Sequence, residues 1–325
     1  MTVFVIRRLM QAALVVLIMS LLVFGGVFLV GDPVEMLVAD DADQAEREAI
    51  IKSMGLDLPF YMQYLRFIGN ALQGDMGNSF VFQESAMHLI AERMPATFEL
   101  AFAALFIAVV LGIPLGIYAG LNANSWISKT IMTSSILGFS LPTFWVGIMM
   151  ILFFAVIMGW LPSSGRGDTV DVFGIPISLL TLDGLSHMLL PAVNLALFKL
   201  SMVIRLARAG TREVVHQDYI KFARAKGLSD TRIIGVHLFK NIMIPVVTVL
   251  GLEFGGLVAF SVVTETVFAW PGMGKLLIDS INFLDRPVIV AYLMFVVVLF
   301  VCINLIVDVL YSVLDPRVRL QEMKS

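Results

Sequence analysis

The sequence predicts an all-α polytopic membrane protein with six transmembrane helices and a small extracytoplasmic lobe between the first two. Three observations predict this class. Apolar residues make up 59% of the 325 residues and charged residues only 14%, against about 25% charged residues in an ordinary soluble domain. The apolar runs recur along the whole chain, and the basic residues gather in three segments between or beside them.

Six apolar runs are long enough to cross a membrane. A span needs about 20 mostly apolar residues, and in lipid only a helix satisfies the backbone of a single segment. The first run follows Arg7 and Arg8, but it is longer than the apolar part of a signal peptide and lacks a small-residue cleavage site, so we expect it to be retained. The six predicted spans are residues 9–30, 97–120, 132–160, 187–207, 242–264 and 288–311.

The basic segments predict the orientation. Lys and Arg concentrate in the N-terminal segment 1–8, in the loop 208–241 between the fourth and fifth spans, and in the tail 312–325. Six crossings place these three segments on one side, which the positive-inside rule makes the cytoplasm. Both termini are then cytoplasmic, and the acidic segment 31–96 forms the extracytoplasmic lobe. The predicted parts are therefore residues 1–30, 31–96, a permeation domain at 97–311 that includes loop 208–241, and the tail 312–325.

Two further segments carry local signals. Residues 161–186 are rich in Gly, Pro, Ser and Asp, which predicts an irregular external loop with weak strand character at 170–177. Gly112, Gly116 and Gly120 recur every fourth residue, as Gly251 and Gly255 do, and such spacing lets helices approach closely. We expect this packing within the chain, with contact to a second subunit as the alternative.

The sequence lacks the motifs of several kinds of functional site. Gly272–Leu276 comes nearest to a phosphate-binding loop, but Ala269 and Leu276 stand where a glycine and a hydroxyl residue are needed. The single cysteine, Cys302, excludes a disulfide within the chain. The net charge of −3 provides no basic field for nucleic acid. We therefore predict no catalytic site, no metal site and no cofactor bound by this chain; the scattered histidines are His88, His187, His216 and His237.

Two charged residues lie deep within predicted spans. Lys199 is about 12 residues into the fourth span and Glu253 about 11 residues into the fifth, which places both near the middle of the bilayer. Charges at this depth are costly and often functional. Lys199 and Glu253 are thus predicted to form a structural ion pair or to line a shared aqueous pathway.

The cytoplasmic loop contains a short amphipathic segment. Tyr219, Phe222 and Ala223 are spaced to share one helical face, Gly227 is suited to end the helix, and Ser229 or Asp230 can begin another. This helix is predicted either to present small and aromatic residues to a protein partner or to lie on anionic lipid. The residues of this predicted site are Gln217, Asp218, Tyr219, Lys221, Phe222, Ala223, Arg224, Ala225, Lys226, Gly227, Leu228 and Ser229.

This segment resembles the coupling-loop signature of ABC importer permeases, E-A-A…G. Ala223 and Gly227 match its second alanine and its glycine, while Lys221 and Phe222 replace the glutamate and the first alanine. The run 223–229 fits the version in the B-type permease of the oligopeptide and dipeptide family. Further matches to that family, in chain order, are Arg7-Arg8, Gly55-Leu56-Asp57, Gly74-Asp75-Met76-Gly77, Arg93-Met94-Pro95-Ala96-Thr97, His237, Leu238, Asn241, Ile244, Pro245, Glu265-Thr266-Val267-Phe268-Ala269-Trp270-Pro271-Gly272 and Leu314-Asp315-Pro316-Arg317.

The resemblance implies a type I ABC importer permease in a bacterial cytoplasmic (inner) membrane. It implies a second homologous permease subunit, two ATP-binding-cassette ATPase subunits that carry ATP and Mg²⁺, and an extracytoplasmic substrate-binding protein. Residues 217–229 would dock onto an ATPase, and Lys199 and Glu253 would lie in the pathway for dipeptides or oligopeptides. The outer mouth would be formed by Glu265, Phe268, Trp270 and Pro271.

Other substrates and classes stay open at this stage. The same subunit type serves importers of nickel, glutathione, opines or sugar oligomers. A secondary transporter driven by an ion gradient is expected to show inverted repeats, and no convincing repeat is found. An intramembrane enzyme would need a catalytic pair, which the motifs do not supply.

Overall fold

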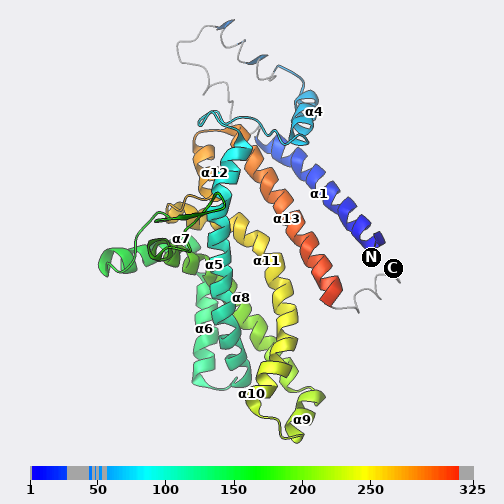
Figure 1. Cartoon of the computed structure of the whole chain (residues 1–325), viewed down its shortest axis with the longest axis vertical. Coiled ribbons are helices and arrows are strands. Elements are labelled where there is room, and N and C mark those ends of the chain that lie inside the picture. The colour runs from blue at the N-terminus through cyan, green and yellow to red at the C-terminus, as the bar shows by residue number, and fades with distance from the viewer. Residues whose placement is uncertain (1, 28–43, 46–47, 49–50, 53–56, 315–325) are drawn as a thin grey trace. The chain divides into compact units, whose positions relative to one another are not determined.

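The computed structural model describes residues 2–27, 44–45, 48, 51–52 and 57–314 (Figure 1). The predicted tail 312–325 and much of the predicted lobe lie largely outside these residues. The long helices are α1 (Thr2–Val27), α5 (Ala86–Leu121), α6 (Trp126–Ser140), α8 (Leu182–Val215), α11 (Phe239–Val267) and α13 (Arg286–Leu314). The shorter elements are α4 (Phe60–Ala71), α7 (Thr143–Met150), the π-helix η1 (Ile151–Ile157), the strands β1 (Val170–Val172) and β2 (Ile175–Ile177), α9 (Asp218–Ala225), α10 (Asp230–Arg232), the π-helix η2 (Ile233–Leu238) and α12 (Met273–Asn282).

Five helices are long and apolar enough to cross a membrane, and a bent pair adds a sixth candidate. The five candidate spans are Ile6–Gly26, Ala86–Leu121, Leu182–Val215, Pro245–Val267 and Arg286–Asp308. The sixth consists of Trp126–Ser140 followed by Thr143–Ile157. The predicted helical membrane fold is thereby confirmed, and five of its spans are continuous helices.

The third predicted span, residues 132–160, is not one continuous helix. Its two halves meet at an angle of 106°, and Figure 1 shows α6 nearly vertical and α7 nearly horizontal. Pro142 disfavours helical geometry in the residue before it, and Leu141 is accordingly extended, with φ −85° and ψ 138°. The hydropathy stays high across this break, because Pro142 interrupts the helical backbone without adding polar residues.

Contacts divide the chain into two compact units, Met1–Thr97 with Pro271–Cys302 and Phe98–Trp270 with Ile303–Ser325. In the first unit, α1 packs on α4 through Phe24, whose ring centre lies 5.2 Å from that of Phe67. The buried carboxylate of Asp285 accepts a hydrogen bond from the Ser79 hydroxyl. Helix α12 follows Gly272, and its first residue, Met273, donates its N–H to Thr97 Oγ1 at 2.8 Å.

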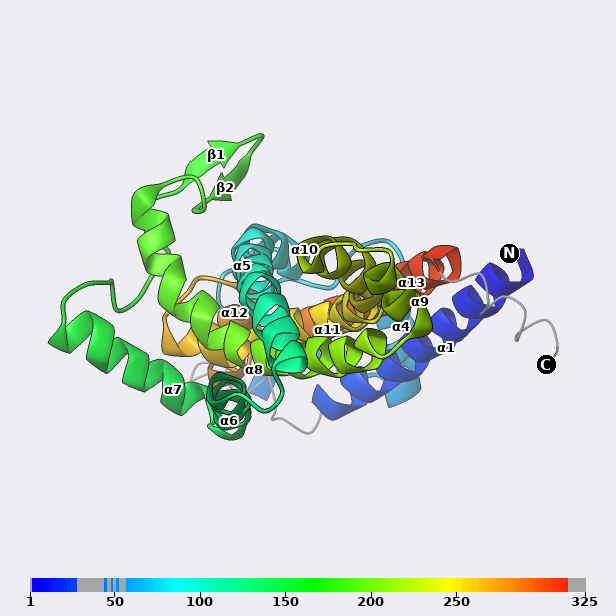
Figure 2. The ribbon, with the colours of Figure 1, turned by 90° about the horizontal axis from the view of Figure 1, so that it is seen from below.

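The second unit is built around α8. Helix α6 runs antiparallel to α8, since the Ser201 hydroxyl donates to the Ser135 carbonyl and Phe139 contacts Phe198. Helix α11 also packs against α8, and Figure 2 shows α6, α8 and α11 side by side. The core of this unit is formed by Ala108, Ile113, Val203, Ala207, Leu238, Ile242, Val246 and Leu250.

The glycines of α5 bring it against α8. A Cβ added to Gly116 would lie 2.6 Å from Ala207 Cβ, and the same approach recurs from Gly112 to Val203 and from Gly120 to Thr211. Because the partners advance in step, α5 and α8 run parallel, and α6, which follows α5 in the chain, runs in the opposite direction. Packing within the chain is thus confirmed for these three glycines. Gly251 on α11 makes a similarly close approach to Val307, 2.7 Å from its Cγ2 atom.

Candidate functional site

Helix α9 lies where the sequence predicts an amphipathic helix. It ends in a Schellman turn: the Leu228 N–H donates to the Ala223 carbonyl at 3.2 Å and the Gly227 N–H to the Arg224 carbonyl at 2.9 Å. Gly227 adopts φ +74°, a left-handed conformation that glycine adopts without strain. Ser229 then begins α10 without a side-chain capping bond.

The inner face of α9 attaches it to two longer elements. Ile220 and Ala223 are buried in a cluster with Ile233 of η2, against which Val214 of α8 and Leu228 also pack. The prediction that Ala223 shares the presented face is therefore wrong. It turns inward because Ile220 lies beside it on the helix and Ile233 covers both.

The outer face of α9 is aromatic and basic. Phe222 is 62% exposed and Tyr219 43% exposed, and the ammonium group of Lys226 lies 4.6 Å from the Phe222 ring centre. The predicted residues Gln217, Lys221, Arg224, Ala225 and Ser229 are exposed as well.

Charge on this face is predominantly positive. Lys221 Nζ donates to Asp218 Oδ1 at 2.9 Å, and this hydrogen bond, with the nearby positive charge, lowers the pKa of the Asp218 carboxyl. Partial burial raises the pKa of the Tyr219 hydroxyl, so Tyr219 is neutral at physiological pH. Arg224 and Lys226 form no ion pair among the described residues, which leaves the face basic and suited to an acidic partner surface.

Lys199 and Glu253 form the predicted ion pair between α8 and α11, through Lys199 Nζ and Glu253 Oε2. The lysine side chain is 9% exposed and the glutamate side chain 35% exposed. Pairing compensates two charges that would be costly alone at this depth. The unequal exposure leaves the carboxylate accessible and buries the cation.

The predicted outer-mouth residues come together in the turn after α11. Trp270 donates its N–H to the Glu265 carbonyl at 2.8 Å, and Phe268 accepts from the Gly165 N–H at 2.9 Å. Glu265, Phe268 and Trp270 are each at most 1% exposed, while Pro271 is half-buried. Main-chain hydrogen bonds therefore hold this turn, and these three side chains are buried within the chain. The side of the membrane that they occupy stays a prediction.

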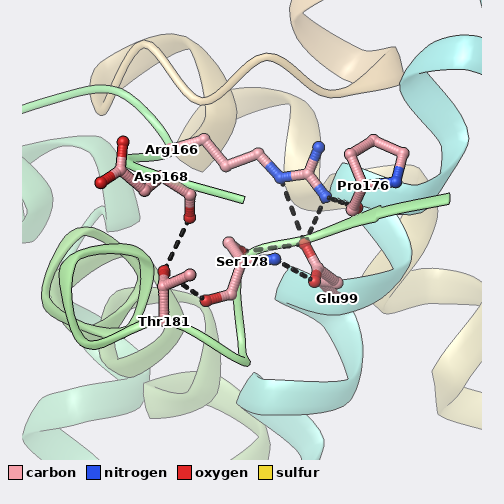
Figure 3. A network of polar contacts seen from close by, with 6 residues as sticks. All are labelled: Glu99, Arg166, Asp168, Pro176, Ser178 and Thr181. Carbon is pink, nitrogen blue, oxygen red and sulfur yellow. Dashed lines mark hydrogen bonds and ion pairs between the residues drawn. The ribbon is translucent and has the colours of Figure 1, made fainter. Parts of the chain in front are cut away.

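A polar network missed by the sequence analysis fastens loop 161–181 to α5 (Figure 3). Glu99 accepts from Arg166 Nε at 3.2 Å and from the Ser178 N–H at 2.8 Å. Arg166 Nη2 also donates to the Pro176 carbonyl at 2.6 Å. The signal was present, because Glu99 is an ionisable residue inside a predicted span, although its partners lie far along the chain.

The network holds a small hairpin. β1 and β2 pair antiparallel through Val170 with Ile177 and Val172 with Ile175, which confirms the strand character predicted at 170–177. Phe173 and Gly174 turn the chain with φ +56° and +82°, as expected for a two-residue hairpin loop.

These features define an integral membrane protein: a bundle of apolar helices with a charged pair in its interior and a basic amphipathic helix at the end of α8. The described residues contain no cluster of three or more His, Cys, Asp or Glu side chains that could hold a metal ion. The chain belongs to the family of binding-protein-dependent transport system inner membrane components. Residues 112–320 match that family, and residues 1–101 match its N-terminal region.

Relatives resemble the chain over nearly its full length. It is 39% identical over 316 residues to the di/tripeptide transport system permease protein DppB of Pseudomonas aeruginosa (strain UCBPP-PA14), covering 93% of this chain and 94% of that protein. It is 38% identical over 320 residues to a putative peptide transport system permease protein of Brucella abortus (strain 2308), covering 98% and 99%. It is 38% identical over 317 residues to the glutathione transport system permease protein GsiC of Escherichia coli (strain K12), covering 97% and 98%.

A solved structure shares the fold. The MetNI methionine ABC transporter, in inward-facing conformations, aligns with a TM-score of 0.55 at 19% identity, covering 70% of this chain and 97% of that chain. The fold of this chain is therefore that of an ABC importer permease.

Proposed function

We propose that this chain is a transmembrane permease subunit of an ATP-binding-cassette importer for short peptides. The observation that carries the proposal is the resemblance, over more than nine-tenths of the chain, to permeases named for di/tripeptide, peptide and glutathione transport. Glutathione is itself a tripeptide, so these names share one chemistry: a small, flexible, zwitterionic peptide backbone. Nickel and sugar oligomers lack that chemistry and opines lack the peptide bond, so these are the less favoured substrates.

In this proposal α9 is the docking element for an ATPase subunit. Its basic and aromatic face is exposed, and its inner face is packed against Ile233 of η2 and Val214 of α8. Because one buried cluster joins α9 to both neighbours, a displacement of α9 moves α8 and η2 with it. Closure of the ATPases on ATP would thereby become a rigid-body motion of the bundle.

The remaining components follow from this role. ATP and Mg²⁺ bind on two partner ATPase subunits, and this chain binds no cofactor. A second homologous permease completes the pathway, and an extracytoplasmic binding protein delivers the peptide. The chain lies in a bacterial inner membrane with both termini in the cytoplasm. The Lys199–Glu253 pair lies along the pathway, where its accessible carboxylate suits a zwitterionic ligand.

The test is uptake by the reconstituted complex. The tagged chain would be purified with its co-purifying subunits, identified by mass spectrometry, and placed in liposomes with its binding protein. We expect uptake of labelled dialanine and glutathione that requires internal ATP and Mg²⁺. Uptake that persists without ATP but collapses with the ion gradient would indicate a secondary transporter and overturn the proposal. ATP-dependent uptake of nickel or a sugar oligomer, without peptides, would overturn its substrate.

A further inference from the structure

A continuous row of aromatic and charged side chains crosses α6, α8 and α11. The guanidinium carbon of Arg205 lies 5.1 Å from the ring centre of Phe139. The Phe139 and Phe198 ring centres are 4.6 Å apart. Lys199 Nζ lies 5.2 Å from the Phe198 ring centre and pairs with Glu253. We call these five residues the cation–aromatic row.

The row is open on one side. Phe139 is 45% exposed and Phe198 38% exposed, and Arg205 is exposed too. In a bilayer, exposed ionisable side chains within a span face water or protein, because facing lipid is costly. This side of the bundle therefore faces an aqueous pathway or a polar partner surface.

The two cations of the row differ in whether a carboxylate pairs with them. Lys199 is compensated by Glu253. Arg205 forms no ion pair among residues 57–314, and its guanidinium carbon lies over the ring of Phe139. A guanidinium group held on a ring keeps its N–H donors directed outward in a plane, which suits a carboxylate. Arg205 is thus an anion site without an anion from this part of the chain.

The ring contact argues against a lipid phosphate as that anion. Arg205 lies two residues before the end of the predicted span 187–207, about 3 Å along the axis. Phe139 lies seven residues after the start of the predicted span 132–160, about 10 Å from that end. The contact therefore holds the guanidinium group back toward the ring, whereas an arginine bound to a headgroup would extend toward the helix end.

The length of the row suits a short peptide. Arg205 follows Lys199 by six residues on the same helix, which is about 9 Å along the axis. An extended peptide spans about 3.3–3.6 Å per residue, so two or three residues match the axial part of this separation. Ammonium and carboxylate groups at the two ends of such a peptide match a carboxylate at one end of the row and a cation at the other.

We infer that the row is a binding site for zwitterionic di- and tripeptides within the translocation pathway. The peptide carboxylate binds Arg205, the peptide ammonium group binds the accessible carboxylate of Glu253, and the peptide side chains lie on Phe139 and Phe198. This inference rests on the proposed function and adds to it a site and a length limit.

The experiment uses the whole transporter with its binding protein in liposomes. Dialanine uptake and ATP hydrolysis are measured for the wild type, Arg205→Gln, Arg205→Lys and the control Arg212→Gln. Arg212 is also an exposed arginine of α8 but lies outside the row. We expect Arg205→Gln to lower uptake per ATP hydrolysed about tenfold, the loss typical of one charge-assisted hydrogen bond, while hydrolysis stimulated by the binding protein stays near the wild-type rate. Arg205→Lys should recover most of the uptake, and Arg212→Gln should resemble the wild type.

A second probe separates the peptide carboxylate from other anions. Dialanine amide lacks the carboxylate, so its ratio of wild-type to Arg205→Gln uptake should be near one. The preference of the binding protein cancels in this ratio, because both transporters use the same binding protein. An equal loss for dialanine and its amide, or a loss seen only in liposomes of anionic lipid, would assign Arg205 to structure or to lipid and overturn the inference.

Failure of the inference and of the proposed function give different results. Wild-type uptake that is matched by Arg205→Gln removes the site and leaves the importer intact. Loss of uptake together with loss of stimulated hydrolysis in Arg205→Gln assigns the residue to assembly and also removes the site. Absence of ATP-dependent dialanine and glutathione uptake by the wild type overturns the proposed function itself, and the site falls with it.

Discussion

Substitution of Gly116 by alanine tests the close packing of α5 on α8. The added Cβ would lie 2.6 Å from both Ala207 Cβ and the Ile204 carbonyl oxygen, about 0.8 Å short of ordinary contact. The Ile204 oxygen is main chain and has no rotamer into which it can move, so the helices must separate. Overpacking costs about 1–3 kcal/mol, and a clash with main chain falls in the upper half of that range, about 2–3 kcal/mol. The higher helix propensity of alanine offsets about 1 kcal/mol. We expect a net loss of about 1–2 kcal/mol.

The assay is heat-induced unfolding of the purified protein in detergent, followed by tryptophan fluorescence. With about 2–4 °C lost per kcal/mol, Gly116→Ala should lower the midpoint by about 2–8 °C. Gly26→Ala is the matched control, since Gly26 lies in a span and has no heavy atom within 4 Å of an added Cβ; its midpoint should stay or rise slightly. Equal midpoints for both variants would refute the reasoning about this interface.

Two further substitutions test the buried polar contacts. Lys199→Met leaves Glu253 without its cation and should cost about 1–3 kcal/mol in the same unfolding assay. The double variant with Glu253→Gln should recover more than half of that loss, and additive losses would contradict the pairing. Glu99→Gln removes the charge that holds loop 161–181. The local stability of the loop should fall by about 1–3 kcal/mol, and its cleavage by added protease should increase at least about threefold. An unchanged cleavage rate would show that the network is dispensable.

The sequence predicts well whatever depends on composition and position along a span. Lys199 and Glu253 could be paired in advance because each falls at the same depth of its own apolar run. The helix at 218–225 was predictable because the signals that start and end it are local. They are a polar start, an amphipathic turn and Gly227 in a left-handed conformation. Such signals are contained in the segment that they describe.

What escaped prediction depends on partners distant in the sequence. Ala223 is buried because Ile233 packs against it. Ile233 lies beyond the turn that ends α9, so the spacing of residues within α9 does not reveal this contact. Glu99 receives Arg166 from a loop 67 residues away. The bend at Leu141 and Pro142 was visible in the sequence, but a hydropathy count ignores the backbone effect of a proline.

Arg205 shows why the depth of a charged side chain in a span is hard to predict from sequence. It lies near the end of the predicted span 187–207, where an arginine is usually assumed to extend toward the headgroups. The structure places it on the ring of Phe139 instead, and only the antiparallel packing of α6 brings that ring within reach. Side-chain depth in a membrane protein is thus set by tertiary contacts as well as by position along the helix.

Cross-linking from α9 tests most directly whether this helix docks onto an ATPase subunit. In a Cys302→Ser background, since Cys302 is exposed and would react, Phe222→Cys places a thiol on the outer face of α9 and Ile220→Cys places one on its buried face. With a short bifunctional reagent in membranes that contain the whole complex, we expect a cross-link from position 222 to a nucleotide-hydrolysing subunit and none from position 220. Labelling of position 222 by a membrane-impermeant thiol reagent added outside intact cells, or no cross-link to any ATPase chain, would contradict it.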